Sequence, residues 1–382
     1  MVPVHRRPFL LLQALGAAND NLVKQATLVL IGFGLISFAG SPSLWTNLAS
    51  GLFILPFLVF STYAGAWVAR TDLKVAIIWV KNLEIGCAVL AGLGLWLGRI
   101  ELLLLALACL GIQSTLFGPT KFTWPARTEA QDQLPSVTGS IEALTFIAIL
   151  VGSLVGGALV SMPGVLAGLV ISLALLGRVL AQRLPAVPAS SVQSDDRKDS
   201  VDTRRARGLI SWFWFLGASY LTQLPLLAEQ LMELPPEGVS WLLAAFAVGV
   251  GLGSKCVNLI GPNSIRIGFI GLIVFSLGLP WLSQLSMPLG VAALAALGVF
   301  GGLYVVPLYV WMQRRLAGPA LPTAIGRNNR LNAVFMVASA GFGILTLAVI
   351  GLSAVEYFSL MALLSLPWWG QIRAFADQDS GS

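Results

Sequence analysis

The feature that most constrains this sequence is a long series of apolar stretches separated by glycine, proline and charged residues. Of the 382 residues, 57% are hydrophobic and only 10% are charged, and the mean hydropathy is +0.84. An ordinary soluble domain carries roughly a quarter charged residues. A helix needs about 20 apolar residues to cross the hydrocarbon core of a bilayer. The sequence therefore predicts an all-α polytopic membrane protein and excludes a soluble enzyme.

Twelve apolar stretches are long enough to be transmembrane helices. A polar, charged segment follows the sixth stretch, and we interpret it as a linker between two six-helix halves. We place the helices at residues 8–33, 43–69, 73–98, 101–124, 136–161, 163–183, 208–232, 239–260, 265–285, 287–313, 324–349 and 351–370. The predicted domains are an N-terminal six-helix bundle (1–183), a charged cytoplasmic linker (184–207), a C-terminal six-helix bundle (208–374) and a cytoplasmic tail (375–382).

Lys and Arg residues are distributed unevenly over the predicted loops. They gather in the loops of one side, whereas the loops of the other side contain only Arg99. Cytoplasmic loops of membrane proteins carry an excess of Lys and Arg. The asymmetry predicts that both termini and the linker are cytoplasmic. It also accounts for the net charge of +6, which is not gathered on a solvent face as binding to nucleic acid would require.

Side chains typical of metal, redox or hydrolytic chemistry are scarce. Cys87, Cys109 and Cys256 lie within apolar stretches and lack the spacing of a metal site or a disulfide framework, so we interpret them as packing residues. The single histidine, His5, precedes the first span, which excludes a Ser-His-Asp arrangement. We therefore expect no metal and no cofactor.

The densest polar cluster inside an apolar stretch lies in the first span, at Asn19, Asp20, Asn21 and Lys24. An ionisable residue at bilayer depth is energetically costly unless it is paired or hydrated, so each one is a candidate functional residue. Asp20 and Lys24 are four residues apart and share one helix face, where an ion pair can form. Such a pair is either purely structural or, as the flanking asparagines favour, part of a substrate or coupling site.

Charged residues also occur in other spans. Lys121, near the cytoplasmic end of the fourth span, either faces the interior or reaches the lipid headgroups. Glu142, in the fifth span, is a candidate to accept a proton, to face a nearby cation or to coordinate one. Lys81 and Glu84 in the third span are three residues apart, and we expect them to pair structurally. Glu356, early in the twelfth span, is either interfacial or internal.

Candidates in the second half gather at the start of the eleventh span, at Asn328, Asn329 and Arg330. The planar guanidinium of Arg330 suits a phosphate group if it faces the interior. The alternative is that Arg330 and Arg327 anchor the helix end at the cytoplasmic surface. The polar residues of the seventh span are Gln223, Glu229 and Gln230.

Proline and glycine residues occur at matching positions in the two halves. Pro119 and Pro307, in the fourth and tenth spans, are 188 residues apart. Gly139 and Gly326, at the starts of the fifth and eleventh spans, are 187 residues apart. Two six-helix repeats joined by a cytoplasmic linker predict the major facilitator fold with 12 transmembrane helices, in which the substrate sits near the midplane between the halves.

Several motifs resemble the lysophospholipid transporter (LplT) family of the major facilitators. The most specific is Phe-Gly-Pro-x-Lys, which ends at Lys121. The others are the Asn19-Asp20-Asn21 run with Lys24, and residues 139–150, 302–308 and 326–333. The resemblance covers nearly the whole chain apart from the linker and the tail. The sequence departs from the superfamily pattern after the second span, where Ala69 stands in place of an Asp and Asp72 is the nearest substitute.

The resemblance implies a bacterial inner-membrane protein that moves lysophosphatidylethanolamine and lysophosphatidylglycerol from the outer to the inner leaflet by alternating access. A cytoplasmic-side acyltransferase would then re-acylate these lipids, and here it would be a separate partner. The protein is expected to act as a monomer.

We expect Asp20, Lys24, Lys121, Glu142 and Arg330 to line the path of the lipid headgroup. The cations would hold the phosphodiester, and a carboxylate would hold the headgroup amine or a coupling proton. The nearest alternative is a proton-coupled exporter of drugs or metabolites that uses the same carboxylates. A sensor or scaffold fits less well, because polar clusters occur at matching positions in both halves.

Overall fold

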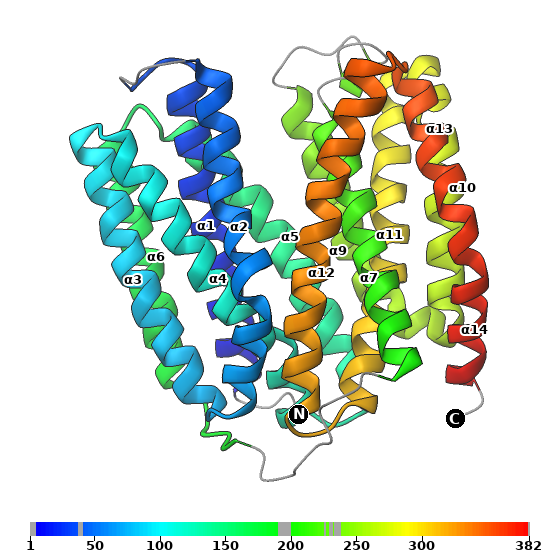
Figure 1. Cartoon of the computed structure of the whole chain (residues 1–382), viewed down its shortest axis with the longest axis horizontal. Helices are drawn as coiled ribbons and strands as arrows, with labels where there is room; N and C mark the ends of the chain where they lie inside the picture. Colours follow the sequence, from blue (N-terminus) through cyan, green and yellow to red (C-terminus); the bar gives the residue numbers. More distant parts are fainter. Residues whose placement is uncertain are drawn as a thin grey trace. The chain divides into compact units, whose positions relative to one another are not determined.

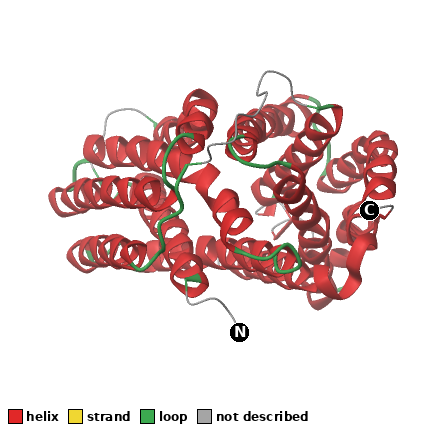
Figure 2. Ribbon diagram, turned by 90° about the horizontal axis from the view of Figure 1, so that it is seen from below, coloured by secondary structure: helices red, strands yellow, loops and turns green. Residues whose placement is uncertain are grey.

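The computed structural model describes residues 5–36, 41–189, 200–224, 227–228, 232 and 238–380. Within those ranges the regular secondary structure is helical, with no strand, as Figures 1 and 2 show. Two of the predicted polar residues, Glu229 and Gln230, lie outside the described residues, as does the central part of the predicted linker, residues 190–199.

Eight segments of the described chain are long and apolar enough to cross a membrane. One of them, Trp241–Gln284, contains two helices, α9 (Gly238–Ile260) and α10 (Ser264–Leu285). Helices α1 (Arg6–Gly32) and α7 (Val201–Thr222) are not among the eight, although they have 27 and 22 residues, because their sequences are more polar. The eight segments are Leu44–Ala69, Leu73–Leu97, Ile100–Thr128, Leu134–Ala158, Pro163–Gln182, Trp241–Gln284, Met287–Arg315 and Ala320–Val349. The prediction of a multi-pass helical membrane protein is confirmed.

The chain forms two compact units, each built from segments distant in sequence. Unit 1 comprises Met1–Glu129, Ala148–Asp195 and Leu316–Arg330. Its helices are α1, α2 (Pro42–Ala69), α3 (Leu73–Leu97), α4 (Ile100–Thr128), α6 (Pro163–Gln182), the second part of α5 (Leu134–Ala158) and the first part of α12 (Ala320–Gly343). Within it, α3 lies beside both α4 and α6 (Figure 1).

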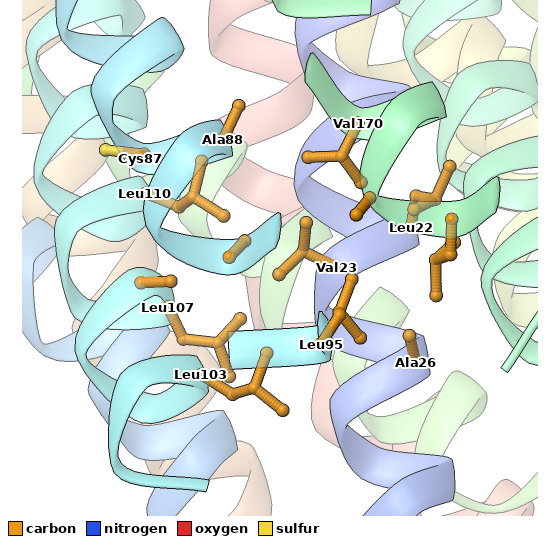
Figure 3. Close-up of a cluster of buried hydrophobic side chains, with 14 of the residues drawn as sticks. Leu22, Val23, Ala26, Cys87, Ala88, Leu95, Leu103, Leu107, Leu110 and Val170 are labelled. Atoms are coloured by element: carbon orange, nitrogen blue, oxygen red, sulfur yellow. The ribbon is translucent and has the colours of Figure 1, made fainter. Parts of the chain in front are cut away.

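The core of unit 1 is a cluster of small and branched apolar side chains. Figure 3 shows residues from α1, α3, α4 and α6 that point toward one another, among them Leu22, Leu95, Leu107 and Val170. Close packing of such small and branched side chains holds membrane helices together at short separation through van der Waals contact. Cys87 belongs to this cluster and Cys109 packs against it, which agrees with the interpretation of these cysteines as packing residues.

Helix α3 begins and ends at residues whose chemistry favours helix termini. The side chain of Asp72 accepts a hydrogen bond of 3.0 Å from the backbone N–H of Val75, which is the usual role of an N-cap. Gly98 follows the last turn with a φ of 60°, a left-handed conformation that glycine adopts without steric penalty. Asp72, the nearest substitute for the missing loop aspartate, therefore stabilises the start of α3.

Contacts at one end of unit 1 join α1 to α4. The Arg6 guanidinium forms an ion pair with Glu129, just after α4, and its Nε lies 3.0 Å from Oε1 of that carboxylate. One turn further along α1, the ring of Phe9 stacks on Trp124 with centroids 5.4 Å apart. These contacts fix the position of α1 against α4, the two helices that carry the polar groups described below.

Helices α2 and α12 approach closely within unit 1, and glycine makes this possible. A Cβ atom added to Gly65 would lie 2.6 Å from the carbonyl oxygen of Pro322 and 3.1 Å from the Cα of Gly326. Both distances are shorter than van der Waals contact, and the obstructing atoms are backbone atoms that cannot move aside. The two helices must separate to accept even a methyl group at position 65.

Gly65→Ala is therefore expected to destabilise the protein by about 1–3 kcal/mol, the usual cost of overpacking, and to lower its Tm in detergent. Gly86→Ala is the matched control, because Gly86 lies in α3 with no atom within 4 Å of an added Cβ. Alanine favours a helix by about 1 kcal/mol over glycine, so Gly86→Ala should keep or raise the Tm. Equal Tm values for the two variants would contradict the close approach.

Unit 2 comprises Ala130–Ile147, Asp196–Arg315 and Leu331–Ser382. Helix α7 begins at Val201, so residues 201–207 of the predicted linker are helical. In the described part of this unit the other long helices are α9, α10, α11 (Met287–Arg315), α13 (Ala354–Ser365), α14 (Trp369–Ser380), the first part of α5 and the second part of α12, which continues as a π-helix over Ile344–Val349.

The predicted twelfth span, at 351–370, differs from the structure. Helix α13 has only 12 residues, and the short 3-10 turn Leu366–Trp368 separates it from α14. Glu356 does not face the interior: it is exposed and forms a capping box with Ser353, in which the Ser353 N–H donates to Glu356 at 2.8 Å. Of the two alternatives for Glu356, internal and interfacial, the exposed side chain supports the interfacial one.

Candidate functional site

The polar residues of α1 lie inside unit 1. Asn19 is 0% exposed and Asp20 is 7% exposed, and Asn21 is also buried. The Asn21 side chain donates to the carbonyl oxygen of Ala17 at 2.8 Å, so it is satisfied within its own helix. Burying these groups is unfavourable unless each finds a partner. What α1 can bind therefore depends on the groups that surround Asn19 and Asp20.

Asp20 has its partner on another helix. The hydroxyl of Ser114, on α4, hydrogen-bonds to Oδ2 of Asp20, and it also lies 3.2 Å from Oε1 of Gln113. The Nε2 of Gln113 in turn donates to Oε2 of Glu84, on α3, at 3.1 Å. A continuous line of polar groups thus runs from α1 through α4 to α3; we call these residues, with Lys81, the Asp20 network.

The network ends in a buried ion pair. Nζ of Lys81 lies 2.6 Å from Oε2 of Glu84 and 2.9 Å from the carbonyl oxygen of Leu12, and the two charged side chains are 1% and 0% exposed. The predicted pairing of Lys81 with Glu84 is confirmed. Glycines leave room for the lysine: an added Cβ would lie 2.8 Å from Nζ at Gly16 and 3.4 Å from it at Gly177.

The charges of Asp20 and Lys24, whose spacing allows an ion pair, attract each other, but the two side chains make no direct ion pair in this structure. Among the described residues, no Lys24 nitrogen lies within ion-pair distance of a carboxylate oxygen. Nζ of Lys24 lies instead 5.5 Å from the centre of the Phe53 ring, on α2, in a cation–π arrangement. Asp20 is directed toward Ser114. The spacing of four residues placed both side chains on one face, but their partners on neighbouring helices determine where they point.

Several buried polar atoms near α1 have no hydrogen-bond partner within the described part of the chain. In the middle of α1 and beside it they include both amide atoms of Asn19, Oδ1 of Asp20 and Oε1 of Glu84. Leaving a buried polar group unsatisfied costs about 1–3 kcal/mol. Such atoms are rare in folded proteins and call for an explanation such as a bound polar group or ion. Asn19 and Asp20 are therefore the strongest candidates for contact with a polar ligand.

The other predicted site residues of unit 1 lie within α4 and within the first part of α12. Lys121 is half-buried, with Nζ 5.1 Å from the centre of the Phe122 ring. Asn328 is buried, and the amide of Asn329 reaches α4, where a Cβ added to Gly118 would lie 2.5 Å from its Nδ2. Arg330 is exposed and lies within α12, ten residues after its first residue.

Glu142 is buried in the first part of α5 and belongs to unit 2. Around it, α5 packs against α9: the Lys255 ammonium hydrogen-bonds to Ser140, and a Cβ at Gly139 would overlap the carbonyl oxygen of Ser254. The structure thus brings Asp20 together with Ser114, Gln113, Glu84 and Lys81 in one unit and assigns Glu142 to the other.

Two members of the Asp20 network, Gln113 and Ser114, were not identified from the sequence. The available signal was their polarity within the fourth apolar stretch. Serine and threonine commonly satisfy their hydroxyl within their own helix, as Thr115 does by donating to Gly111 at 2.7 Å. Polarity alone therefore did not distinguish the serine that bonds to another helix.

Comparison with known proteins assigns the chain to a family. The model of the Major Facilitator Superfamily matches residues 22–340. Two curated relatives, each named lysophospholipid transporter LplT, come from Yersinia pestis (strain Pestoides F) and Yersinia pseudotuberculosis serotype O:3 (strain YPIII). Each is 27% identical over 334 residues, covering 79% of this chain and 77% of the relative.

Solved structures share the fold. The human organic anion transporter MFSD10 matches with a TM-score of 0.77 at 12% identity, over 97% of this chain and 100% of that protein. The fucose:proton symporter of E. coli matches with a TM-score of 0.73 at 12% identity, over 98% and 99%. The predicted fold is confirmed, and the protein is a membrane transporter, not an enzyme. The chain belongs to the major facilitator superfamily.

Proposed function

We propose that this protein moves lysophospholipids, chiefly lysophosphatidylethanolamine and lysophosphatidylglycerol, from the outer to the inner leaflet of a bacterial inner membrane. The observation that carries the proposal is the buried carboxylate of Asp20, with one oxygen unpartnered among the described residues beside the unpartnered amide of Asn19. The names of the curated relatives at 27% identity support the same substrate class.

The chemistry of a lysophospholipid fits these groups. Its headgroup carries a phosphodiester and, in the ethanolamine lipid, an ammonium, and these charges need polar partners inside a membrane protein. Asp20 would accept hydrogen bonds from the ammonium, and the Asn19 amide would donate to a phosphate oxygen. Lys24 is the nearby cation for the phosphodiester. The single acyl chain requires no polar partner and would remain in an apolar setting.

We also propose an orientation in the membrane, a partner enzyme, an oligomeric state and further site residues. Both termini would be cytoplasmic, since Lys and Arg gather in the loops of that side. A separate acyltransferase would re-acylate the lipid on the cytoplasmic side, and the transporter would act as a monomer. Asn21, Lys121, Glu142, Asn328, Asn329 and Arg330 complete the set of residues proposed for substrate binding or coupling.

Uptake of labelled lysophosphatidylethanolamine by spheroplasts tests the substrate class. We expect spheroplasts that express the protein to take up the lipid faster than spheroplasts carrying an empty vector. A fluorescent drug is added in a parallel sample to test the exporter alternative. Drug efflux that unlabelled lysophospholipids do not inhibit, together with no lipid uptake by a correctly inserted protein, would replace the proposal with drug export.

A further inference from the structure

Helices α13 and α14 lie beside α10 in unit 2, and the chain is interrupted between them (Figure 1). Pro367 has no N–H to donate to the preceding turn, and its ring clashes with a continuing helix. Helix α13 therefore ends at Ser365, and α14 begins at Trp369 after the short 3-10 turn. Beside this interruption, against α10, lies a groove of about 450 Å³.

The described side chains that line the groove are aliphatic or aromatic. Ile270, Ile273 and Val274 come from α10, and Leu366 and Trp369 come from the beginning and the end of the interruption. Ile270, Val274 and Leu366 are exposed, so the described part of the chain does not cover the groove. Its volume lies within the range of about 300–1,000 Å³ that is typical of small-molecule sites. A hydrocarbon chain of the bilayer fits this lining, because neither needs a polar partner.

Aromatic contacts hold the walls of the groove in place. The ring of Trp369 stacks on the buried ring of Phe269, on α10, with centroids 6.3 Å apart. Trp368 stacks on Trp212, on α7, with centroids 5.3 Å apart. The indole N–H of Trp212 also donates to the hydroxyl of Ser365 at 3.2 Å. Since the turn is held on two sides, the groove is formed before any ligand binds, as most small-molecule sites are.

Two arginines lie at one end of the groove. Arg266 is four residues before Ile270 on α10, and Arg373 is four residues after Trp369 on α14. Residues four apart share a helix face, so each arginine follows the groove-lining face of its helix. Helix α14 also contacts the turn Gly261–Asn263, which precedes α10, whereas α13 contacts α10 itself. The two helices therefore run in opposite directions, which brings both arginines to the same end.

A cationic end and an apolar body match the chemistry of an anionic phospholipid. A guanidinium binds phosphate oxygens with two parallel hydrogen bonds, and arginines near a membrane surface attract anionic lipids. From Arg266 to Val274, α10 rises by about 12 Å, so an acyl chain that starts near the arginines can extend along the groove into the hydrocarbon. Trp369 lies between these levels, and tryptophan is enriched at the boundary between headgroups and hydrocarbon.

The carboxylates of this helix come later in the sequence. Asp377 and Asp379 follow Arg373 by one turn or more of α14, on the side away from the groove. Arg373 is exposed, and Arg266 is half-buried. A phosphate at the end of the groove would therefore meet the two arginines before it meets a carboxylate.

We propose that the groove and the two arginines form a binding site for one anionic diacyl phospholipid of the bilayer. One acyl chain would lie along Ile270 and Val274, and the phosphate would lie between the guanidiniums of Arg266 and Arg373. The site belongs to unit 2, whereas the Asp20 network belongs to unit 1. The lipid is therefore a ligand in addition to the proposed substrate, and the inference does not rest on the proposed function.

Photocrosslinking of the purified full chain in detergent tests the site without any variant. The probe is phosphatidylglycerol with a diazirine in one acyl chain, and mass spectrometry of the peptides locates the crosslinks. We expect crosslinks concentrated at 270–274 and 366–369. Unlabelled phosphatidylglycerol should compete about 25-fold better than phosphatidylcholine, since each of two arginines favours an anionic lipid by about fivefold. Crosslinks spread evenly over the exposed apolar side chains of unit 2 would overturn the proposal.

Arg266→Gln combined with Arg373→Gln should abolish the preference for phosphatidylglycerol over phosphatidylcholine, because glutamine keeps hydrogen-bonding groups but carries no charge. Arg315→Gln is the matched control: Arg315 is exposed in the last turn of α11, a helix that contributes no residue to the groove. It should keep the full preference. If the double variant does not fold, the exposed Arg373 is changed alone, with an expected fivefold loss. An unchanged preference in a folded variant would overturn the role of the arginines.

The remaining competitors distinguish other occupants of the groove. Inorganic phosphate should not reduce the crosslinks, and a reduction would assign the arginines to a free anion. Lysophosphatidylethanolamine that competes as well as phosphatidylglycerol would assign the groove to the substrate. A native mass spectrum showing a dimer without bound lipid would assign it to a second copy of the chain. Each of these three results would overturn the proposal. Crosslinks as expected, in a protein without lysophospholipid uptake, would support the lipid site and contradict the proposed substrate.

Discussion

Asp20→Asn is expected to lower the rate of lysophosphatidylethanolamine uptake about 100-fold and to leave the Tm of the purified protein unchanged or higher. An asparagine keeps the hydrogen bond to Ser114, because its amide oxygen can accept from the Ser114 hydroxyl as the carboxylate oxygen does. It cannot bind a headgroup ammonium by a charge-assisted hydrogen bond, which contributes about 1.5–3 kcal/mol, and it cannot exchange a proton. Each 1.4 kcal/mol corresponds to about a factor of ten.

Thr27→Val provides the control for this prediction. Thr27 is buried on the same helix, and its hydroxyl donates to the carbonyl oxygen of Val23 at 2.9 Å, so its loss affects α1 alone. Uptake by Thr27→Val should remain near that of the wild type. Wild-type uptake by a stable Asp20→Asn variant would exclude Asp20 from both substrate binding and coupling.

Lys81→Met is expected to destabilise the protein by about 3–5 kcal/mol, because it leaves the buried carboxylate of Glu84 without its cation. Glu84 would keep the hydrogen bond from Gln113, which does not neutralise its charge. The effect should appear as a large fall in Tm in detergent and as faster digestion by protease. Changing both partners removes the buried charge, so Lys81→Met combined with Glu84→Gln should recover most of the Tm.

The double variant distinguishes electrostatics from packing. Lys81 fills the space that Gly16 and Gly177 leave open, and methionine has a similar length, so the space stays occupied. If the Tm falls equally in the single and the double variant, the ion pair contributes little to stability. The loss then comes from the packing of the lysine side chain. A Lys81→Met variant as stable as the wild type would contradict the buried charge pair altogether.

The fold could be predicted because long apolar stretches admit few structures in a membrane. The local pair of Lys81 and Glu84 could also be predicted, since three residues along a helix bring both side chains to one face. The same reasoning failed for Asp20 and Lys24. Spacing determines the face that a side chain occupies, and it contains no information about a serine on α4 or an aromatic ring on α2 that offers a better partner.

Other features of the structure differ from the prediction for two separate reasons: a proline that breaks a helix, and the tertiary contacts of long helices. The predicted twelfth span is interrupted at Leu366–Trp368, where Pro367 was the available signal. The division of α5 after Ile147 and of α12 after Arg330 follows from which neighbours each part of the helix contacts. Neither division has a signal in the hydrophobic pattern, because both helices are continuous.

The most direct test of the proposed transport uses the purified protein in liposomes that contain a fluorescent lysophosphatidylethanolamine. A membrane-impermeant reductant destroys the fluorescence of lipid in the outer leaflet, so protected fluorescence measures movement between leaflets. The account predicts movement by the wild type that greatly exceeds that in protein-free liposomes and is almost absent with Asp20→Asn. Movement no faster than in protein-free liposomes, by a protein with the Tm of the folded state, would contradict the account.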